Sequence, residues 1–214
     1  MTHSYMTNLK ITKPFQNYTD SIDKFKTPCW FFHGVDIPEI NYDEMDWESS
    51  LGEPLQNDDL FALRFIASEP QLTQNIRTKP LIDHLNSIQA SVMSEIRENH
   101  CEGTDLDKIY PVHTWKYQPQ NASIQKQLKG FKMGRHLDNR NAKFTFLLNL
   151  EDNNESTYFL TKNFKNTPDD KQVITAPAKK GSGVFFFNYH TLLHGIGPIT
   201  SDTRYIFFLQ QFMS

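Results

Sequence analysis

The stretch Lys143-Phe-Thr-Phe-Leu-Leu-Asn-Leu150 predicts a β-strand with two unlike faces. Side chains in a strand point alternately to opposite sides of the sheet. One set is wholly apolar and consists of Phe144, Phe146, Leu148 and Leu150. The other set consists of Lys143, Thr145, Leu147 and Asn149. We therefore expect the first face to pack into a core and the second to look into a polar site.

Six further segments of the C-terminal half share this character. They are short, rich in aromatic and β-branched residues, and separated by Asn, Asp, Gly and Pro. The segments are 112–117, 131–137, 157–160, 172–176, 183–188 and 204–213. Seven short strands at this spacing predict a mainly β fold, namely a β-sandwich, a barrel or a jelly roll.

The N-terminal half has a different pattern. Apolar residues recur at steps of four, three, four and four in one segment, which predicts a helix over 81–100; they are Leu81, Leu85, Ile88, Val92 and Ile96. We expect a shorter helix over 59–67 and a buried strand over 29–33. The chain 1–214 then forms a single domain, in which 1–109 is a helical and mixed supporting region and 110–214 is the β core.

Composition excludes several classes of protein. The 214 residues suit one domain, and 22 Lys and Arg against 25 Asp and Glu give a net charge of −3. A nucleic-acid partner is not expected, because general nucleic-acid binding needs a strong basic excess. No apolar run approaches the roughly 20 residues that a membrane span needs, and the first residues lack the features of a signal peptide. Two cysteines, Cys29 and Cys101, make no disulfide framework. We expect a soluble, cytoplasmic protein with free thiols, and the sequence leaves its oligomeric state open.

Charge is unevenly distributed along the chain. No Lys or Arg lies between Lys26 and Arg64, whereas 36–59 holds nine carboxylates. Segment 108–180 has thirteen Lys and Arg against six acids. One interpretation is a solvated acidic loop with ordinary surface lysines. The other is an acidic lip beside a basic pocket mouth that suits a small anionic cosubstrate.

The motif His136-Leu-Asp138 lies at the end of a predicted strand, where residues i and i+2 point to the same side. His194 follows 56 residues beyond Asp138, directly after the predicted strand 183–188, and Arg204 stands ten residues after His194. Two histidines and one carboxylate on adjacent strands make a facial triad for Fe(II) that leaves coordination positions open. An arginine on the next strand can reach a carboxylate held one small molecule away.

Ordinary roles remain as alternatives for each of these residues. His136 and Asp138 taken alone fit a surface hydrogen-bonded pair, and Arg204 taken alone fits a salt bridge at a strand end. His190, four residues before His194, is the nearest rival for the third ligand position. A second His-x-acid motif, at 100–102, falls at a predicted helix end, where the two side chains diverge.

In combination, these motifs resemble the Fe(II)/2-oxoglutarate-dependent oxygenases, particularly the prolyl-hydroxylase-like branch. The resemblance covers roughly 110–214. Besides the His-x-Asp motif and the strand after it, it rests on Ser156-Thr-Tyr-Phe159, the strand 183–188, and the run from His194 to Pro198-Ile-Thr-Ser-Asp-Thr-Arg204-Tyr205. It implies a double-stranded β-helix core, of the jelly-roll or cupin-like type, with N-terminal helices against one sheet.

The resemblance also implies roles for individual residues. His136, Asp138 and His194 would be the ligands of Fe(II). Arg204 would pair with the distal carboxylate of the cosubstrate 2-oxoglutarate, since a guanidinium binds a carboxylate through two parallel hydrogen bonds. O₂ would be the third reactant. Because related halogenases lack the carboxylate, Asp138 favours hydroxylation.

Two further cosubstrate-binding residues follow from the same resemblance. Asn149, on the polar face of strand 143–150, would offer its side chain to 2-oxoglutarate. Tyr117 would match the tyrosine of the preceding strand, although its longer separation from the His-x-Asp motif suggests that 118–130 is an inserted loop. Asn154-Glu155 stands where relatives often carry a Gly-Gly turn.

The resemblance implies hydroxylation of a peptidyl or free amino-acid side chain, coupled to decarboxylation of 2-oxoglutarate to succinate. The partners would then be 2-oxoglutarate and a peptide, protein or amino-acid substrate. One alternative keeps the chemistry and changes the substrate to a small metabolite or a nucleobase. Another is a non-enzymatic jelly-roll module that holds zinc or no metal.

Overall fold

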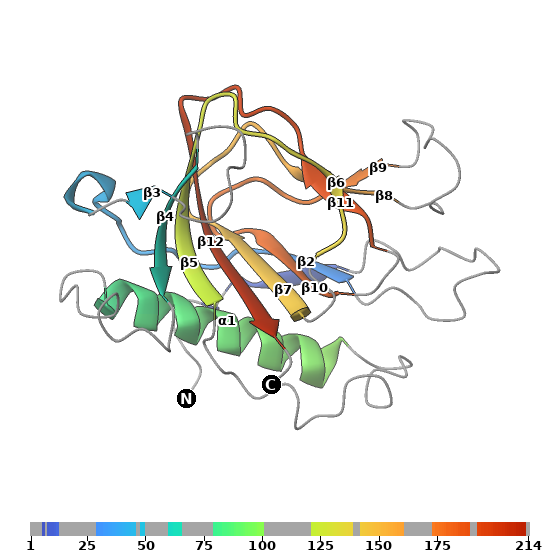
Figure 1. Cartoon of the computed structure of the whole chain (residues 1–214). Helices are drawn as coiled ribbons and strands as arrows, with labels where there is room; N and C mark the ends of the chain where they lie inside the picture. The colour runs from blue at the N-terminus through green and yellow to red at the C-terminus, as the bar shows by residue number, and fades with distance from the viewer. Residues whose placement is uncertain are drawn as a thin grey trace.

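Two antiparallel β-sheets, one α-helix and a short 3₁₀ helix, Tyr42–Glu44, form the regular structure of the described residues (Figure 1). The computed structural model describes residues 6, 8–12, 29–45, 48–49, 60–65, 79–100, 121–138, 142–160, 173–188 and 192–212. Within these residues the fold is mainly β. This confirms the mainly β fold class that the short alternating segments predict.

The larger sheet has eight strands in the order β1-β2-β10-β7-β12-β5-β4-β3. In that order their bounds are Lys10–Thr12, Cys29–His33, Gly183–Phe187, Ala142–Asn149, Thr203–Phe212, Asn121–Leu128, Leu60–Phe65 and Glu48–Ser49. Strand β7 lies near the centre, where Phe146 pairs with Phe185 of β10 and with Leu209 of β12.

The smaller sheet has four strands in the order β6-β11-β8-β9. Their bounds are Met133–His136, His194–Ile196, Thr157–Leu160 and Val173–Thr175. This sheet packs on one face of the larger sheet, because Phe159 of β8 belongs to the same buried cluster as Leu147, Phe186 and Ile206. The two sheets therefore form a sandwich.

The opposite face of the larger sheet is covered by the helix α1, Lys79–Asn99 (Figure 1). Leu85, Ile88 and Ile96 of the helix are fully buried in one cluster with Phe146 and Leu148 of β7. The helix predicted over 81–100 and the two unlike faces predicted for 143–150 are both confirmed. The apolar face of β7 packs against the helix, and its other face looks toward the smaller sheet.

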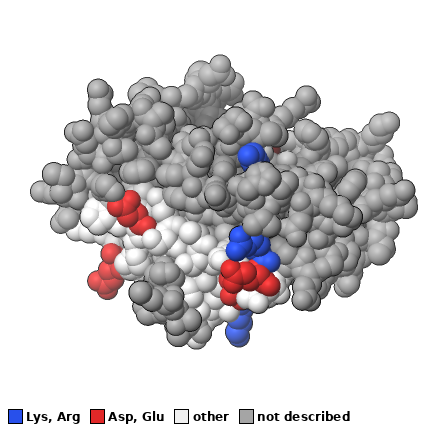
Figure 2. Space-filling model, turned by 90° about the horizontal axis from the view of Figure 1, so that it is seen from below, with Lys and Arg blue, Asp and Glu red and all other residues white. Residues whose placement is uncertain are grey.

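Seen from below, on the side of α1, the surface of the molecule carries both acidic and basic side chains among its described residues (Figure 2). Arg97 and Glu98, both on α1, form an ion pair at 3.4 Å. Part of the acidic segment 36–59 lies outside the described residues. None of the described helices is both long enough and apolar enough to cross a membrane.

The short helix predicted over 59–67 is wrong. Leu60–Phe65 is strand β4, which pairs with β5 over six residues. A short apolar run does not distinguish a helix from a strand by its own periodicity. The pairing partner determines that this segment is a strand, because β5 offers it a full row of backbone hydrogen-bonding groups.

The prediction of an inserted loop over 118–130 is also wrong for most of this segment. Asn121–Leu128 is strand β5, which lies between β12 and β4 in the larger sheet. Its sequence, Asn-Ala-Ser-Ile-Gln-Lys-Gln-Leu, has a single β-branched aliphatic residue and reads locally as a polar connection. The predicted strand 112–117 lies outside the described residues.

The region 1–109 thus contributes strands as well as support. Strands β1 to β4 all join the larger sheet, whereas the described part of this region holds one α-helix rather than the two predicted.

Cys29 of β2 is a buried free thiol, and burial raises its pKa well above the usual value. Cys101 is outside the described residues.

Candidate active site

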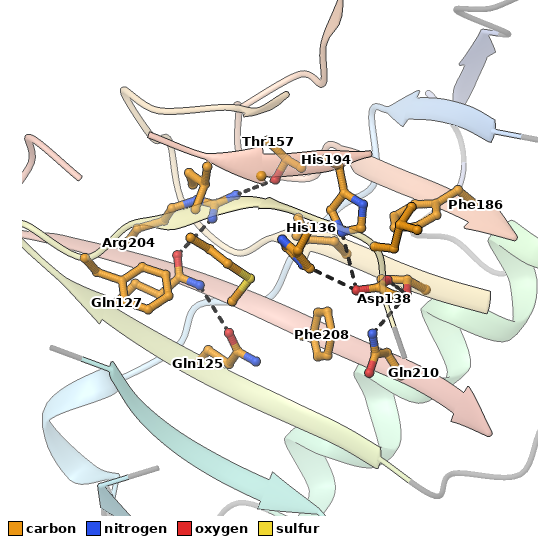
Figure 3. Close-up of a pocket in the computed structure, with 17 residues that line it drawn as sticks. Gln125, Gln127, His136, Asp138, Thr157, Phe186, His194, Arg204, Phe208 and Gln210 are labelled. Atoms are coloured by element: carbon orange, nitrogen blue, oxygen red, sulfur yellow. Dashed lines mark hydrogen bonds and ion pairs between the residues drawn. The ribbon is translucent and has the colours of Figure 1, made fainter. Parts of the chain in front are cut away.

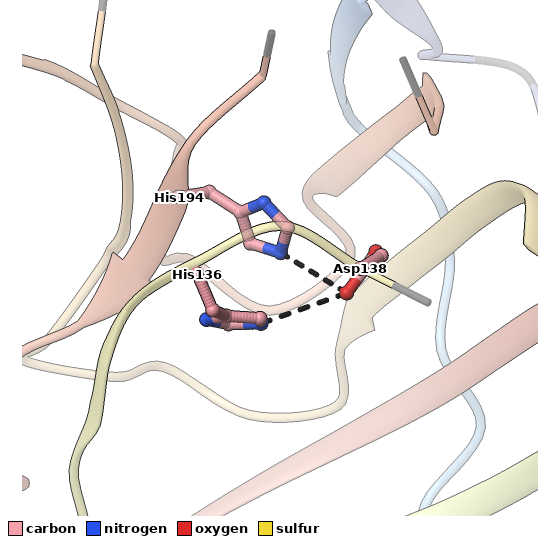
Figure 4. Close-up of side chains that lie close together, drawn as sticks. All are labelled: His136, Asp138 and His194. Atoms are coloured by element: carbon pink, nitrogen blue, oxygen red, sulfur yellow. Dashed lines mark ion pairs between the residues drawn. The ribbon is translucent and has the colours of Figure 1, made fainter. Parts of the chain in front are cut away.

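His136, Asp138 and His194 meet at one edge of the smaller sheet. His136 ends β6 and His194 begins β11, and these two residues are direct partners in the antiparallel pairing of the two strands. Asp138 follows two residues after β6. Its Oδ1 lies 3.5 Å from Nε2 of His136 and 3.4 Å from Nε2 of His194 (Figure 4). One ligand atom from each residue therefore converges on a common point, all within 4.8 Å of one another.

Backbone carbonyls orient both imidazole rings. Nδ1 of His136 is 2.9 Å from the carbonyl oxygen of Gly134, and Nδ1 of His194 is 3.1 Å from that of Leu192. A carbonyl only accepts, so each Nδ1 carries the hydrogen and each Nε2 is left to face Asp138. Metal-ligating histidines are commonly oriented in this way. Two imidazole lone pairs and a carboxylate oxygen repel one another unless a proton or a cation lies between them, so the donor set fits a metal ion.

Electrostatics keep Asp138 ionised. Burial acts to raise its pKa, but hydrogen bonds with His136, His194 and Thr145 outweigh burial and lower the pKa well below its usual range. The hydrogen bond with Asp138 in turn raises the pKa of His136. Thr145 Oγ1 donates to Oδ2 of Asp138 at 2.5 Å, which leaves Oδ1 to face the two histidines.

Arg204 on β12 is a buried cation. Its side chain is 2% exposed, Nη1 donates to Oε1 of Gln127 at 2.9 Å, and Nη2 lies 3.5 Å from both Asn149 Oδ1 and Thr157 Oγ1. Burial lowers the pKa of Arg204 to about 10, so the guanidinium stays charged at neutral pH. Nε has no hydrogen-bond partner, and no described carboxylate forms an ion pair with this side chain. A buried charge without a counter-ion is costly, and an anionic ligand would remove that cost.

The triad and Arg204 line the same cavity, whose volume is about 290 Å³ (Figure 3). Apolar side chains form much of its wall, including Leu147, Phe186 and Phe208. This volume is near the lower end of small-molecule pockets, which range from roughly 300 to 1,000 Å³. The cavity therefore suits a small ligand, and the buried cation favours an acid.

Two solved structures share this fold. A 2OG-Fe(II) oxygenase family oxidoreductase from Burkholderia pseudomallei gives a TM-score of 0.50 at 12% identity, covering 78% of this chain and 72% of its own. A prolyl hydroxylase from Trichoplax adhaerens, in complex with a hypoxia inducible factor oxygen degradation domain peptide fragment, gives a TM-score of 0.53 at 15% identity, covering 80% and 72%. The chain has the fold of the 2OG-Fe(II) oxygenases. By sequence, it matches no protein-family model and no curated protein.

Within this 2OG-Fe(II) oxygenase fold, four of the six predicted site residues line one cavity: His136, Asp138, His194 and Arg204. Tyr117 and His190 lie outside the described residues. The second His-x-acid motif shows no such convergence in its described part, since His100 at the end of α1 pairs with Glu95 at 3.8 Å.

Asn149 has a different position from the other predicted site residues. It is 1% exposed and is not among the residues that line the cavity. Its Nδ2 donates to the carbonyl oxygens of Pro177 and Ser182 at 2.9 and 3.0 Å, and its Oδ1 lies 3.5 Å from Nη2 of Arg204. Asn149 therefore contacts the arginine rather than the cavity.

Several polar residues of the oxygenase-fold cavity were missed from the sequence. Gln125 and Gln127 of β5, Thr157 of β8 and Gln210 of β12 all line it. The available signal was the period of two in Ser123-x-Gln125-x-Gln127, which places all three side chains on one face of a strand. This period of two is typical of a strand and not of a loop.

Proposed function

We propose that the protein is an Fe(II)/2-oxoglutarate-dependent oxygenase that hydroxylates a peptidyl or free amino-acid side chain. One observation carries the proposal: a single cavity in a 2OG-Fe(II) oxygenase fold holds a His-Asp-His cluster and a buried arginine that has no described counter-ion. The reaction would consume 2-oxoglutarate and O₂ and yield succinate, CO₂ and the hydroxylated substrate.

We propose in addition that the sandwich is a double-stranded β-helix over 110–214. The order of the strands supports this topology. From β6 to β12 the chain passes between the sheets repeatedly, with β6, β8, β9 and β11 in the smaller sheet and β7, β10 and β12 in the larger one. In such a core the site lies between the sheets, where the described cavity is.

His136, Asp138 and His194 would hold the Fe(II). Three protein ligands on one side of the metal leave positions open for other molecules, as in the facial triads of non-haem iron enzymes. When bound, Fe(II) would supply, with 2-oxoglutarate and O₂, the oxidising power that an unreactive C–H bond requires. The carbonyl groups of Gly134 and Leu192 would keep both Nε2 atoms directed at the metal, and Thr145 would keep Asp138 ionised and fixed.

Arg204 would bind the distal carboxylate of 2-oxoglutarate. The rigid fork of a guanidinium matches a carboxylate through two hydrogen bonds, and low exposure strengthens the attraction between the charges. Thr157 lies at the same end of the cavity, where its hydroxyl could donate to that carboxylate. Asn149 would act on the cosubstrate through Arg204, since its own donors are used by backbone carbonyls. Tyr117 remains a prediction from the sequence.

The apolar part of the wall would exclude water from the reacting atoms and hold the aliphatic part of a substrate. Phe186, Phe208 and Leu147 provide this surface. The structural neighbour from Trichoplax adhaerens was solved with a peptide fragment, and we extend the peptide class to this chain as part of the proposal. A small metabolite is the second candidate, which the limited volume of about 290 Å³ favours.

The test is spectroscopic and chemical. Anaerobic addition of Fe(II) and 2-oxoglutarate should give the weak visible charge-transfer band of the chelated complex, and air should then give succinate. His136→Ala and His194→Ala should each abolish the band, whereas His33→Ala, at an exposed position on β2, should not. A folded wild-type protein that gives neither band nor succinate contradicts the proposal. If His190→Ala abolishes the band and His194→Ala does not, the ligand assignment is wrong.

A further inference from the structure

Gln127 makes the shortest contact to the Arg204 guanidinium. Its side chain is 4% exposed, and its Oε1 accepts from Nη1 at 2.9 Å, whereas the two contacts of Nη2 are 3.5 Å long. The two residues are direct partners across the β5–β12 pairing, so the backbone fixes their separation. Gln127 is therefore the group that positions the arginine.

Arg204 also sets the direction of a chain of hydrogen bonds along β5. A guanidinium only donates, so Gln127 must present Oε1 to it and turn Nε2 the other way. Nε2 of Gln127 then donates to Oε1 of Gln125 at 3.1 Å (Figure 3). Nε2 of Gln125 donates in turn to Oγ of Ser123 at 3.3 Å. Each side chain in the row is held by the one before it.

The amide of Gln127 is neutral, so this contact does not compensate the charge of Arg204. A glutamate in its place would accept the same hydrogen bond and would also cancel the charge. Glu155 attracts Arg204 only from a distance, and no described carboxylate forms an ion pair with it. Among the described residues, Nη2 has only two contacts, both 3.5 Å long, so this nitrogen is available to a ligand.

We propose that Gln127 is a positioning and specificity residue, which makes the cavity select a 2-oxo acid that carries a second carboxylate. It holds the guanidinium in place by one hydrogen bond while it keeps the positive charge for the ligand. This inference rests on the proposed function, because it assumes that 2-oxoglutarate occupies the cavity.

The deciding variant is Gln127→Glu, which the row of hydrogen bonds can accommodate. The new carboxylate accepts from Arg204 with one oxygen and, after the Gln125 amide turns over, accepts from Nε2 of Gln125 with the other. Ser123 then donates its hydroxyl to Oε1 of Gln125 instead of accepting. No hydrogen bond is lost, so we expect this variant to fold.

The first experiment compares two ligands of equal chain length, 2-oxoglutarate and 2-oxopentanoate, which lacks the distal carboxylate. Both are titrated into anaerobic Fe(II)-loaded protein, and binding is measured by the rise in Tm and by the visible band. In Gln127→Glu, 2-oxoglutarate should bind roughly 100-fold more weakly, the scale of losing a buried charge pair. Binding of 2-oxopentanoate should change little, so the preference between the ligands collapses. If the variant keeps the wild-type preference, the inference is overturned.

The matched control is Lys129→Gln, which makes the same change in net charge two residues away at an exposed position. Exposed charges are strongly screened by salt. We therefore expect the control to keep the wild-type preference for 2-oxoglutarate over 2-oxopentanoate. A control that loses this preference as fully as Gln127→Glu would overturn the role of the specific contact.

The second experiment needs neither metal nor cosubstrate. The Tm of the ligand-free protein is measured for Gln127→Glu, Arg204→Gln and the double variant. Gln127→Glu should leave Tm unchanged or higher when Arg204 is present, and should lower it when Arg204 is absent, because a buried carboxylate is then unpaired. If the change in Tm of the double variant equals the sum of the changes in the two single variants, the inference is overturned. Failure of the wild type to bind 2-oxoglutarate contradicts the proposed function, while this cycle still tests the Gln127–Arg204 contact.

Discussion

His136 and His194 are direct partners across the β6–β11 pairing, with ring centroids 4.4 Å apart, although 57 residues separate them in the chain. The backbone ladder of the smaller sheet therefore fixes the distance between the two imidazoles. Asp138 follows two residues after the strand that carries His136. Two short segments therefore bring together three potential metal ligands. Four predictions follow for the triad and the neighbouring residues.

Asp138→Asn should greatly weaken Fe(II) binding. The substitution keeps the shape of the side chain and removes the charge that attracts the cation and balances it in a buried site. Bound iron after anaerobic dialysis is the measurement, and Asp202→Asn, at an exposed position, is the control. A variant that retains a full equivalent of iron would show that the carboxylate is not needed to hold the metal.

Thr145→Val should make metal binding more sensitive to acid. The hydroxyl donates to Asp138 at 2.5 Å and helps to lower the pKa of that carboxyl, so its removal raises the pKa. The carboxylate must be ionised to bind metal, and stability from a lowered pKa is lost as pH falls. Iron loss on acidification should therefore begin at a higher pH than in the wild type, and affinity at neutral pH should fall by roughly 10- to 100-fold. An unchanged acid profile would rule out this role for Thr145.

Arg204→Lys should strongly weaken the binding of 2-oxoglutarate, although it keeps the positive charge. An ammonium cannot make the two parallel hydrogen bonds of a guanidinium, and it cannot keep both the Gln127 contact and a ligand carboxylate in the same geometry. We expect the KM for 2-oxoglutarate to rise by more than about tenfold. Arg135→Lys, at an exposed position on β6, should leave KM unchanged. The prediction is contradicted if the two variants have the same KM.

Asn149→Ala should lower both stability and cosubstrate affinity. The amide satisfies the carbonyl oxygens of Pro177 and Ser182 in a buried region, and each unsatisfied buried group costs about 1–3 kcal/mol. Urea unfolding should report a loss of this size. The KM for 2-oxoglutarate should rise less than in Arg204→Lys, because Asn149 would act on the cosubstrate only through its contact with Arg204. A KM that rises as much as in Arg204→Lys would instead indicate direct contact with the cosubstrate.

Part of the fold could be predicted because the deciding pattern is local. Strand β7 alternates strictly between apolar and mixed residues, and α1 repeats its apolar residues with the period of a helix, so each segment specifies its own conformation and its buried face. The site could also be predicted in part. The spacing of His136, Asp138, His194 and Arg204 is a property of the chain, and strand periodicity is enough to bring His136 and Asp138 to one side.

Other features depend on contacts that no short segment contains. Leu60–Phe65 becomes a strand because β5 offers it hydrogen-bonding partners, and β5 is itself a strand because β12 pairs along its length. The polar side chains of β5 are unusual for a central strand and occur there because they face a cavity rather than a core. The position of Gln127 opposite Arg204 follows only from the pairing of β5 with β12. The sequence by itself determined the candidate metal ligands and the two-faced strand, since these follow from local periodicity and residue chemistry. Only the tertiary structure decided which neutral side chain holds the arginine, since strand pairing joins residues that are distant in the chain.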